Sequence, residues 1–258
     1  MHPFDRAIAL SSRAPHHWSA HIEPRWNIGD APNGGYLQAL TIEAMARELE
    51  HPDPLTVTTH YIGRVEAGED AEIIVEPIKD GRSNSVAMAS LVQDGREKLR
   101  TLGTFTDLDE QTGTTLQRAY PPEFPPPDEC LGGDPSEAPF EFVKQFDIRF
   151  APDLAHSSTS EIGGWIRFRE DRDPDLASMP LFADGFPPTV FSIGALGWVP
   201  TLELTVHFRA RPEPGWLQCL FTTHLIRDGH FEEDGVIWDA SGRAVAQSRQ
   251  LARILPQS

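Results

Sequence analysis

The sequence predicts an α+β protein built from two similar halves, each an antiparallel sheet packed on a helix. The first observation is an internal repeat: the pattern HYxxRxxxG at 60–68 returns as HFxxRxxxG at 207–215, 147 positions later. A second is a long, slim, apolar helix pattern, and a third is a series of β-rich runs separated by Asp-Gly and Ser-Gly turns. A period this long indicates a duplicated domain, because the repeats of solenoid proteins are far shorter.

The first half is predicted to open with a strand or hairpin at 16–28 and a turn at 29–35. The turn, GDAPNGG, is rich in residues that precede a helix. A helix is then expected over 36–49, where Leu37, Leu40 and Ala44 share one face and further alanines keep the helix slim, as suits a helix enclosed by a sheet. Two Asp-Gly turns should join the strands that follow as hairpins. These strands are expected at 55–64, 71–78, 84–92 and 96–106.

The second half is predicted to repeat this order. A helical stretch is expected from about 174 to 193, and Pro187-Pro188 should kink or break it, because proline lacks the N–H that a helix interior needs. Strands are expected before it at 142–150 and 163–169, and after it at 201–210, 216–226, 231–238 and 244–254.

The segment between the halves differs in composition from both. Residues 109–139 contain two runs of consecutive prolines and few apolar anchors, which is typical of a semi-rigid linker. The expected organisation is therefore a first domain at 1–108, a linker at 109–139 and a second domain at 140–258.

Composition and charge exclude several classes of partner. The 258-residue chain is 39% hydrophobic and 24% charged, as in ordinary globular domains, but its net charge is −17. That charge argues against nucleic acid and against anionic membrane surfaces, which bind clustered Lys and Arg. No stretch is apolar enough for a membrane span, and the N-terminus does not resemble a signal peptide. With only Cys130 and Cys219, a reducing compartment is favoured, and the cytoplasm is the expected location.

Common catalytic and cofactor motifs are missing from the sequence. It contains no Gly-x-Ser-x-Gly nucleophile elbow, no phosphate-binding GxxxxGK[ST] loop, no GxGxxG and no cysteine pair at zinc spacing. No metal and no cofactor is therefore expected. Motifs of this kind do not identify the reaction that the protein catalyses.

The order of elements and the segment Pro32-Asn33-Gly34-Gly35-Tyr36 carry a resemblance to a known family. A strand, a long helix and a four-strand meander, followed by a tandem copy, resembles the double hotdog fold. Outside 109–139, the whole chain is similar to the acyl-CoA thioesterase II family. The resemblance implies two tandem antiparallel sheets, each wrapping a long helix, an acyl-CoA substrate, and a homo-oligomer formed as a dimer of double hotdogs.

The same resemblance implies which residues are catalytic. The family hydrolyses fatty acyl-CoA thioesters with an Asp, a Thr or Ser, and a Gln around one water. Asp184 fits the Asp in the second helix, and Thr201, seven residues before Phe208, fits the Thr that begins the next strand. Gln250, on the last strand after a valine-alanine pair, fits the Gln, with Gln247 as the alternative amide.

The chemistry of a thioester agrees with such a set. Sulfur donates poorly to the carbonyl, so hydrolysis needs a positioned water, a base and an oxyanion site rather than a covalent nucleophile. Asp184 would take a proton or orient the water, while Thr201 and Gln250 would hold that water. Asn33, Gly34 and Gly35 are expected to bind substrate, because backbone N–H groups at a helix start can polarise a carbonyl oxygen.

The repeat separates the two halves by function. In the 147-residue register Thr201 corresponds to Pro54 and Gln250 to Gly103, so one active site per chain is expected. Arg64 and Arg211 occur in both copies, and they either hold the repeat together or contact the phosphates of CoA.

Two other functions remain open on this evidence. One is a non-catalytic acyl-CoA binding or assembly module, because a fold does not fix a function. The other is an enoyl-CoA hydratase or dehydratase on the same fold, whose active-site loop the segment Asp30-Ala31-Pro32-Asn33 resembles only loosely, with no His following. The net charge favours CoA over an acidic carrier protein, and the acyl chain length is not readable from the sequence.

Overall fold

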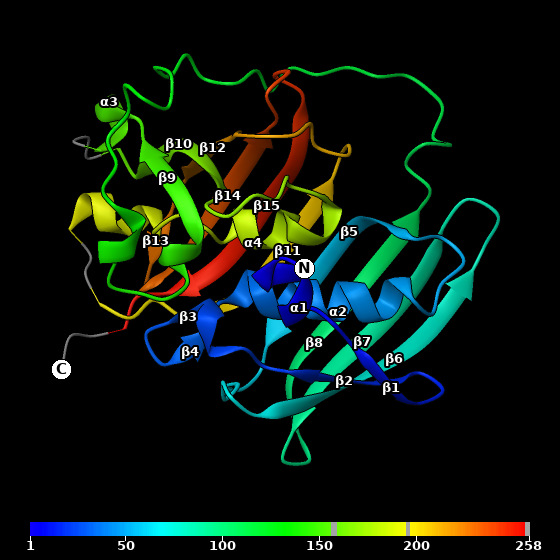
Figure 1. Cartoon of the computed structure of the whole chain (residues 1–258). Coiled ribbons are helices and arrows are strands. Elements are labelled where there is room, and N and C mark those ends of the chain that lie inside the picture. The colour runs from blue at the N-terminus through cyan, green and yellow to red at the C-terminus, as the bar shows by residue number, and fades with distance from the viewer. Residues whose placement is uncertain (156–158, 195–196, 256–258) are drawn as a thin grey trace.

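One antiparallel sheet runs through both halves of the molecule (Figure 1). The computed structural model describes residues 1–155, 159–194 and 197–255. The strand order is β1-β2-β6-β7-β8-β5-β11-β15-β14-β12-β10-β9, with β13 beside β14. The first half contributes β1 (Ser11–Ala14), β2 (His17–His21), β5 (Asp53–Tyr61), β6 (Asp70–Asp80), β7 (Ser85–Gln93) and β8 (Arg96–Thr106). The second contributes β9 (Phe146–Phe150), β10 (Glu161–Phe168), β11 (Thr201–Phe208), β12 (Leu217–Thr222), β13 (Ile226–Arg227), β14 (His230–Trp238) and β15 (Ala244–Arg253). A separate pair is β3 (Asn27–Ile28) and β4 (Ala31–Pro32).

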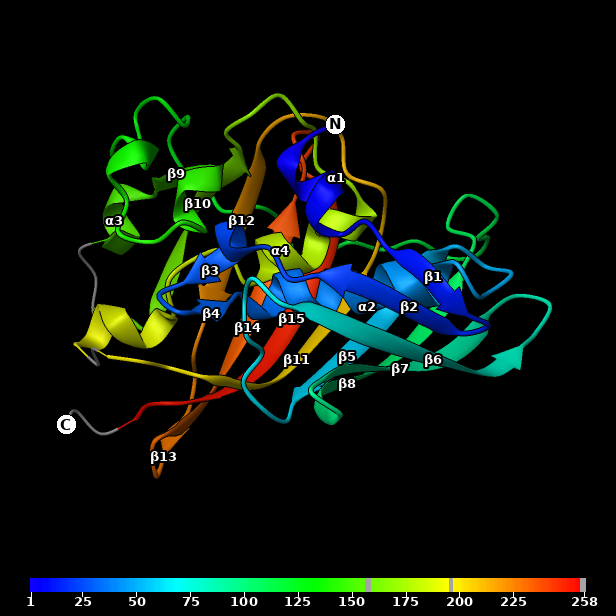
Figure 2. The same cartoon turned by 60° about the horizontal axis from the view of Figure 1, so that its bottom comes forward.

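The hotdog arrangement that the sequence predicts is confirmed, with the two tandem sheets joined edge to edge where β5 pairs with β11. The helical elements lie on the sheet and around its ends (Figures 1 and 2). The α-helices are α1 (Pro3–Ala7), α2 (Gly34–Ala46), α3 (Pro152–Ala155) and α4 (Met179–Ala183). The 3₁₀ turns are η1 (Pro24–Trp26), η2 (Pro135–Glu137), η3 (Val143–Gln145), η4 (Leu176–Ser178) and η5 (Thr189–Ile193). Among the described residues, no helix is long and apolar enough to cross a membrane.

Helix α2 is enclosed on nearly every side. All but three of its 13 residues are buried, against strands β5 to β8 on one side and α4 on another. Two of the buried residues are polar, and both are hydrogen-bonded: Gln38 Nε2 donates to Thr59 Oγ1 at 2.9 Å, and the hydroxyls of Thr41 and Thr101 are 3.0 Å apart. Gln38 Oε1, by contrast, is buried without a hydrogen-bond partner among the described residues. A helix that is buried all round stays within the core of a larger protein.

The helical stretch of the second half is shorter than the sequence predicts. Instead of one element over 174–193, it consists of η4, α4 and η5, with α4 only five residues long. The break follows from Gly185 and Pro187-Pro188, since neither proline can donate the N–H that would continue the helix. The consequence is that α4 ends at Asp184, beside the start of α2.

In the structure, the two copies of the 147-residue repeat are related by a pseudo-twofold axis. At the β5–β11 junction Thr58 pairs with Thr205, which is its own counterpart 147 positions later, and their hydroxyls are 2.8 Å apart. The registers of the neighbouring strands follow the same rule. Val57 pairs with Gly103 in the first half as Leu204 pairs with Gln250 in the second.

The pseudo-symmetry extends to an irregularity in the strands. The register of β5 against β8 shifts between Pro54 and Thr56, and that of β11 against β15 shifts between Thr201 and Glu203, again 147 positions on. Bulges of this kind re-aim side chains at the ends of strands. Thr201 is therefore the structural counterpart of Pro54, at the same bulge in the other half.

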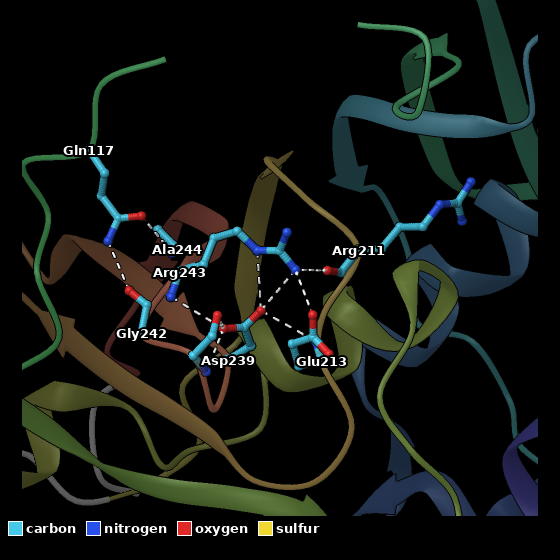
Figure 3. A network of polar contacts seen from close by, with 8 residues as sticks. Gln117, Arg211, Glu213, Asp239, Gly242, Arg243 and Ala244 are labelled. Atoms are coloured by element: carbon cyan, nitrogen blue, oxygen red, sulfur yellow. Dashed lines mark hydrogen bonds and ion pairs between the residues drawn. The ribbon is translucent and has the colours of Figure 1, made fainter.

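The segment 109–139 lies on the second half and is bound to it by hydrogen bonds. The side chain of Gln117 accepts from the N–H of Ala244 at 3.0 Å and donates to the carbonyl of Gly242 at 2.9 Å, next to the Asp239–Arg243 ion pair (Figure 3). Further along, the indole of Trp238 donates to the Ala119 carbonyl at 2.8 Å. This side-chain anchoring gives a segment whose one regular element is the short turn η2 a fixed course, which brings its end to the site described next.

Candidate active site

One cavity of about 890 Å³ lies between the two halves. First-half residues Asn33 and Gly34 line it, and so do Asp184, Thr201 and Gln250 of the second half. The structure thus brings all three sequence-predicted catalytic side chains, and two of the three predicted substrate-binding residues, to the same cavity. Its volume is in the range of cavities that hold small molecules and cofactors.

Asp184 is anchored to the start of α2. Its Oδ2 accepts from Asn33 Nδ2 at 2.8 Å and from the N–H of Gly35 at 3.0 Å, and its backbone carbonyl accepts from Asn33 Nδ2 at 3.0 Å. Burial raises the pKa of Asp184 to about 6, although these donors and the N–H of Gly34 favour the charged form. A carboxylate with such a pKa is charged at neutral pH and can still take up a proton.

The N-terminal cap of α2 fixes the orientation of Asn33. Its Oδ1 accepts from the N–H of Tyr36 at 2.9 Å, as expected of a helix cap. Because an amide has one oxygen and one NH₂, the NH₂ group is left to face Asp184. The same side chain therefore starts the helix and holds the carboxylate.

Close packing requires a glycine at position 35, because a Cβ there would overlap the backbone carbonyl of Pro180. Gly34 is also tightly surrounded, since a Cβ there would lie 3.0 Å from the Tyr61 hydroxyl and 3.1 Å from Asp184 Oδ2. Gly34 lines the cavity, whereas Gly35 lies behind it, where its N–H already donates to Asp184. The helix start thus holds the carboxylate, and its use in polarising a substrate carbonyl stays a prediction.

Thr201 and Gln250 form a hydrogen-bonded pair across two strands. The hydroxyl of Thr201, at the start of β11, donates to Gln250 Oε1 at 3.1 Å. Gln250 on β15 is only 6% exposed. Gln247 is not among the cavity-lining residues, since a spacing of three on a strand places it on the opposite face. The structure therefore places Gln250, not the alternative Gln247, at the cavity.

Glu233 contacts this pair, and no sequence pattern had marked it as a site residue. This residue of β14 is 5% exposed, and its carboxylate accepts from Gln250 Nε2 at 2.9 Å. Burial raises the pKa of Glu233 to about 7. In the sequence it stands within Glu232-Glu233-Asp234, which resembles a solvated charged run. The period-two pattern was the available signal, because Glu233 shares its face of the strand with buried Phe231.

Tyr61 lines the cavity and is a second residue that was not predicted as part of the site. Its hydroxyl donates to the carbonyl of Gly34 at 2.8 Å. Burial, with Asp184 and Glu203 nearby, raises the pKa of Tyr61 well above its usual range, so that the phenol stays protonated. Tyr61 thereby holds the first turn of α2 in place from the cavity side.

The remaining walls are strongly aromatic, and two acidic residues, Asp134 and Glu137, also line them. Residues 133–138, at the end of the segment between the halves, contribute to them, a role that its composition did not indicate. Among the described lining residues, Arg64 is the one cationic side chain. The aromatic residues of the walls, besides Tyr61, are Phe140, Phe142, Phe146, Phe150, Phe186, Phe191 and Trp198.

Comparison with known proteins agrees with this arrangement. Residues 22–106 match the family model described as the acyl-CoA thioesterase N-terminal domain, and residues 121–254 match that of the acyl-CoA thioesterase C-terminal domain. The crystal structure of a proposed thioesterase II from Thermobifida fusca YX is 33% identical, with a TM-score of 0.91 over 99% of this chain and 98% of that one.

More distant relatives share the fold along the whole chain. An acyl-CoA thioesterase II, TesB2, from Mycobacterium marinum is 19% identical, with a TM-score of 0.81 and 99% of each chain covered. An uncharacterised protein of Mycobacterium tuberculosis is 25% identical over 93% of this chain and 91% of its own length. The similarity thus includes both halves and the strands that carry the candidate site.

Proposed function

The chain belongs to the family of double hotdog acyl-CoA thioesterases, and from this premise we propose that it hydrolyses the thioester of an acyl-CoA to a carboxylic acid and CoA. The observation that supports hydrolysis is the convergence of Asp184, Thr201 and Gln250 on one apolar cavity. A cavity of this kind accommodates an acyl group, and the three polar side chains lie where a single water could be held.

In the proposed reaction Asp184 is the general base. The attacking water forms a bond to the thioester carbonyl carbon while one of its protons passes to the Asp184 carboxylate. The tetrahedral intermediate then collapses, the C–S bond breaks, and the proton returns from Asp184 to the departing thiolate. The cap of Asn33 and the N–H of Gly35 hold the carboxylate in place throughout, so that little reorganisation accompanies the proton transfer.

Thr201 and Gln250 orient the water in this proposal. The Thr201 hydroxyl donates its proton to Gln250, so its oxygen can accept a hydrogen bond from the water. A water that donates to both Thr201 and Asp184 would direct a lone pair at the carbonyl carbon. Positioning of this kind contributes to rate by removing the entropy cost of bringing the reactants together.

A panel of acyl-CoAs that differ in chain length and branching tests the proposal by release of free thiol. We expect turnover of at least one member, and a loss of about 10³ in kcat/KM for Asp184→Asn. Saturable binding of acyl-CoA in calorimetry, with no thiol released from any member, would instead identify the chain as an acyl-CoA binding module.

A further inference from the structure

A buried carboxylate stands directly behind the candidate site. Glu233 on β14 lies opposite Gln250 in the β14–β15 pair. Its Oε1 accepts from Gln250 Nε2 at 2.9 Å, and its Oε2 accepts from the backbone N–H of Thr189 at 2.7 Å. Both carboxylate oxygens are therefore occupied by donors, one from the site and one from the segment after α4.

The direction of these hydrogen bonds fixes the Gln250 amide. When Glu233 is ionised its carboxylate only accepts, so the part of the amide that faces it in that state has to be the NH₂ group. The amide oxygen is then the atom that faces Thr201, whose hydroxyl donates to it at 3.1 Å. A threonine hydroxyl has one proton, and once that proton is given to Gln250 the hydroxyl can only accept from any further group.

We propose that Glu233 is a positioning residue that holds the Gln250 amide in one of its two orientations and so keeps the Thr201 hydroxyl as an acceptor for the attacking water. The inference rests on the proposed hydrolysis. Without Glu233 the amide is free to turn over and present its NH₂ to Thr201. The hydroxyl proton would then point into the cavity, where it would compete for the water's lone pair instead of accepting its proton.

The first half supports this connection by what it lacks. There Ala87 pairs with Gly103 as Glu233 pairs with Gln250 in the second half. The half without the amide also lacks the carboxylate. Glu233 thus belongs to the same difference between the halves as the candidate catalytic residues do.

The energetics argue against a purely structural role. Burial, together with the like charge of Asp184, raises the pKa of the Glu233 carboxyl, and the Thr189 and Gln250 donors offset only part of that effect. A carboxylate under these conditions is an unfavourable choice for packing alone, because well-packed apolar side chains are often at least as stable at such positions.

Steady-state kinetics on a double-mutant cycle tests the inference. The variants are Glu233→Ala, Glu233→Gln, Gln250→Ala and the Glu233→Ala/Gln250→Ala pair, with Asp234→Asn as the matched control on the same strand. Asp234 forms an ion pair with exposed Arg249, away from the cavity lining. An amide at position 233 has one acceptor where the carboxylate has two, so Glu233→Gln should also lose one of its two hydrogen bonds.

We expect both single Glu233 variants to lower kcat about tenfold or more with KM changed less than twofold, and Asp234→Asn to leave kcat unchanged. In the Gln250→Ala background, Glu233→Ala should cause no further loss of kcat. Equal losses of kcat in both backgrounds, or a wild-type kcat for Glu233→Ala, would overturn the positioning role.

Side-chain NMR keeps the test independent of turnover. In the ¹⁵N-labelled wild-type protein, the Gln250 NH₂ pair, assigned by its loss in Gln250→Ala, should exchange slowly because one proton is bound to a buried carboxylate. It should exchange at least tenfold faster in Glu233→Ala. Unchanged exchange would overturn the inference, whereas protected exchange in a protein that releases no thiol would overturn the proposed hydrolysis alone.

Discussion

The two halves share one framework and differ at a few equivalent positions. Where the first half has Pro54, Gly103 and Ala87, the second has Thr201, Gln250 and Glu233 (paired as above). Both halves have the same strand pairing and the same bulge at these positions. The three polar residues occur in the second half alone. The first half therefore contributes the N-terminus of helix α2 to the site, and the second half contributes the polar side chains.

The repeated arginines differ in the same way. Arg211 donates to both carboxylate oxygens of buried Asp53, at 2.8 and 2.7 Å, and so ties the second half to the first. The counterpart of Asp53 is Pro200, which gives Arg64 no such partner. Arg64 contacts Asp30 O and Glu66 instead and lines the cavity. One arginine is therefore structural, and the other is available to a ligand.

The strongest loss of activity is expected from a change of Asp184, the proposed base in the second half. Asp184→Asn should lower kcat/KM by about 10³, within the usual range for a lost general base. Because the pKa of Asp184 is raised to about 6, wild-type kcat/KM should rise about tenfold per pH unit below that value and level off above it. A pH–rate profile measures this, and an acid limb that persists in Asp184→Asn would assign the limb to another group.

The stability of the protein should depend on pH through Glu233, whereas its first-half counterpart, Ala87, has no group that titrates. In the folded protein the pKa of Glu233, about 7, lies above its ordinary value of 4.5, so the stabilising contribution of this carboxyl is present below pH 4.5 and is lost as pH rises through 7. Between those limits Glu233→Gln should gain about 3 kcal/mol in free energy of unfolding relative to wild type. Chemical denaturation at several pH values measures the change, and a pH-independent difference contradicts it.

A third prediction compares two hydroxyls on the joined strands. Thr201→Val removes the hydroxyl at the cavity and should lower kcat about 10- to 100-fold, since it removes a hydrogen bond that positions the water. Thr58→Val removes a hydroxyl at the pseudo-twofold axis, outside the cavity lining, and should leave kcat near the wild-type value. Equal losses from the two changes would mean that kcat reports the packing of the junction.

The structural arginine should have a smaller effect, on stability. Arg211→Ala leaves the Asp53 carboxylate buried, and we expect a loss of about 1–2 kcal/mol, because the guanidinium is half-exposed and solvent screens the pair. Differential scanning calorimetry should show Tm lower by roughly 3–6 °C. Arg64→Ala is the matched control, and an equal drop in its Tm would remove the distinction between the two.

The smallest expected effect is on substrate affinity. Arg64→Ala should raise KM for an acyl-CoA about 3- to 10-fold at unchanged kcat, as for one exposed charge-assisted contact with a phosphate. The KM for an acyl-pantetheine, which lacks the phosphates, should not change. A similar increase for both substrates would place Arg64 in the shape of the cavity and not in phosphate recognition.

Sequence patterns predicted most of the strands and the first helix, because these elements depend on residues that are close in the sequence. Hairpin turns, alternation and the repeat predicted most of the strands and the hairpins that join β6, β7 and β8. The predicted four-strand meander was wrong for β5, which pairs with β8 and β11 and not with β6. The start of α2 was predicted two residues late, since Gly34 and Gly35 lower helix propensity, and Gly35 is needed there because Pro180 approaches it closely. Contacts between the halves decide that position, and one half's local sequence does not contain them.

The candidate site was predicted unevenly for the same reason. Asp184, Thr201 and Gln250 follow from resemblance, but their neighbours depend on which strand lies beside which. Glu233 looks solvated until the β14–β15 register buries it, and residues 133–138 form a cavity wall only because distant anchors direct the chain there. Register and tertiary course were the missing information in both cases.

The Thr58–Thr205 contact has a consequence for dividing the chain. Cutting the chain within 109–139 would yield two fragments. In each, one edge of β5 or β11 would lose its partner strand, and the unpaired N–H and C=O groups of that edge would promote association. The natural partner for each bare strand is the other fragment. Co-expressed halves should therefore reassemble as a heterodimer that completes the cavity, whereas either half alone is prone to aggregate through its open edge.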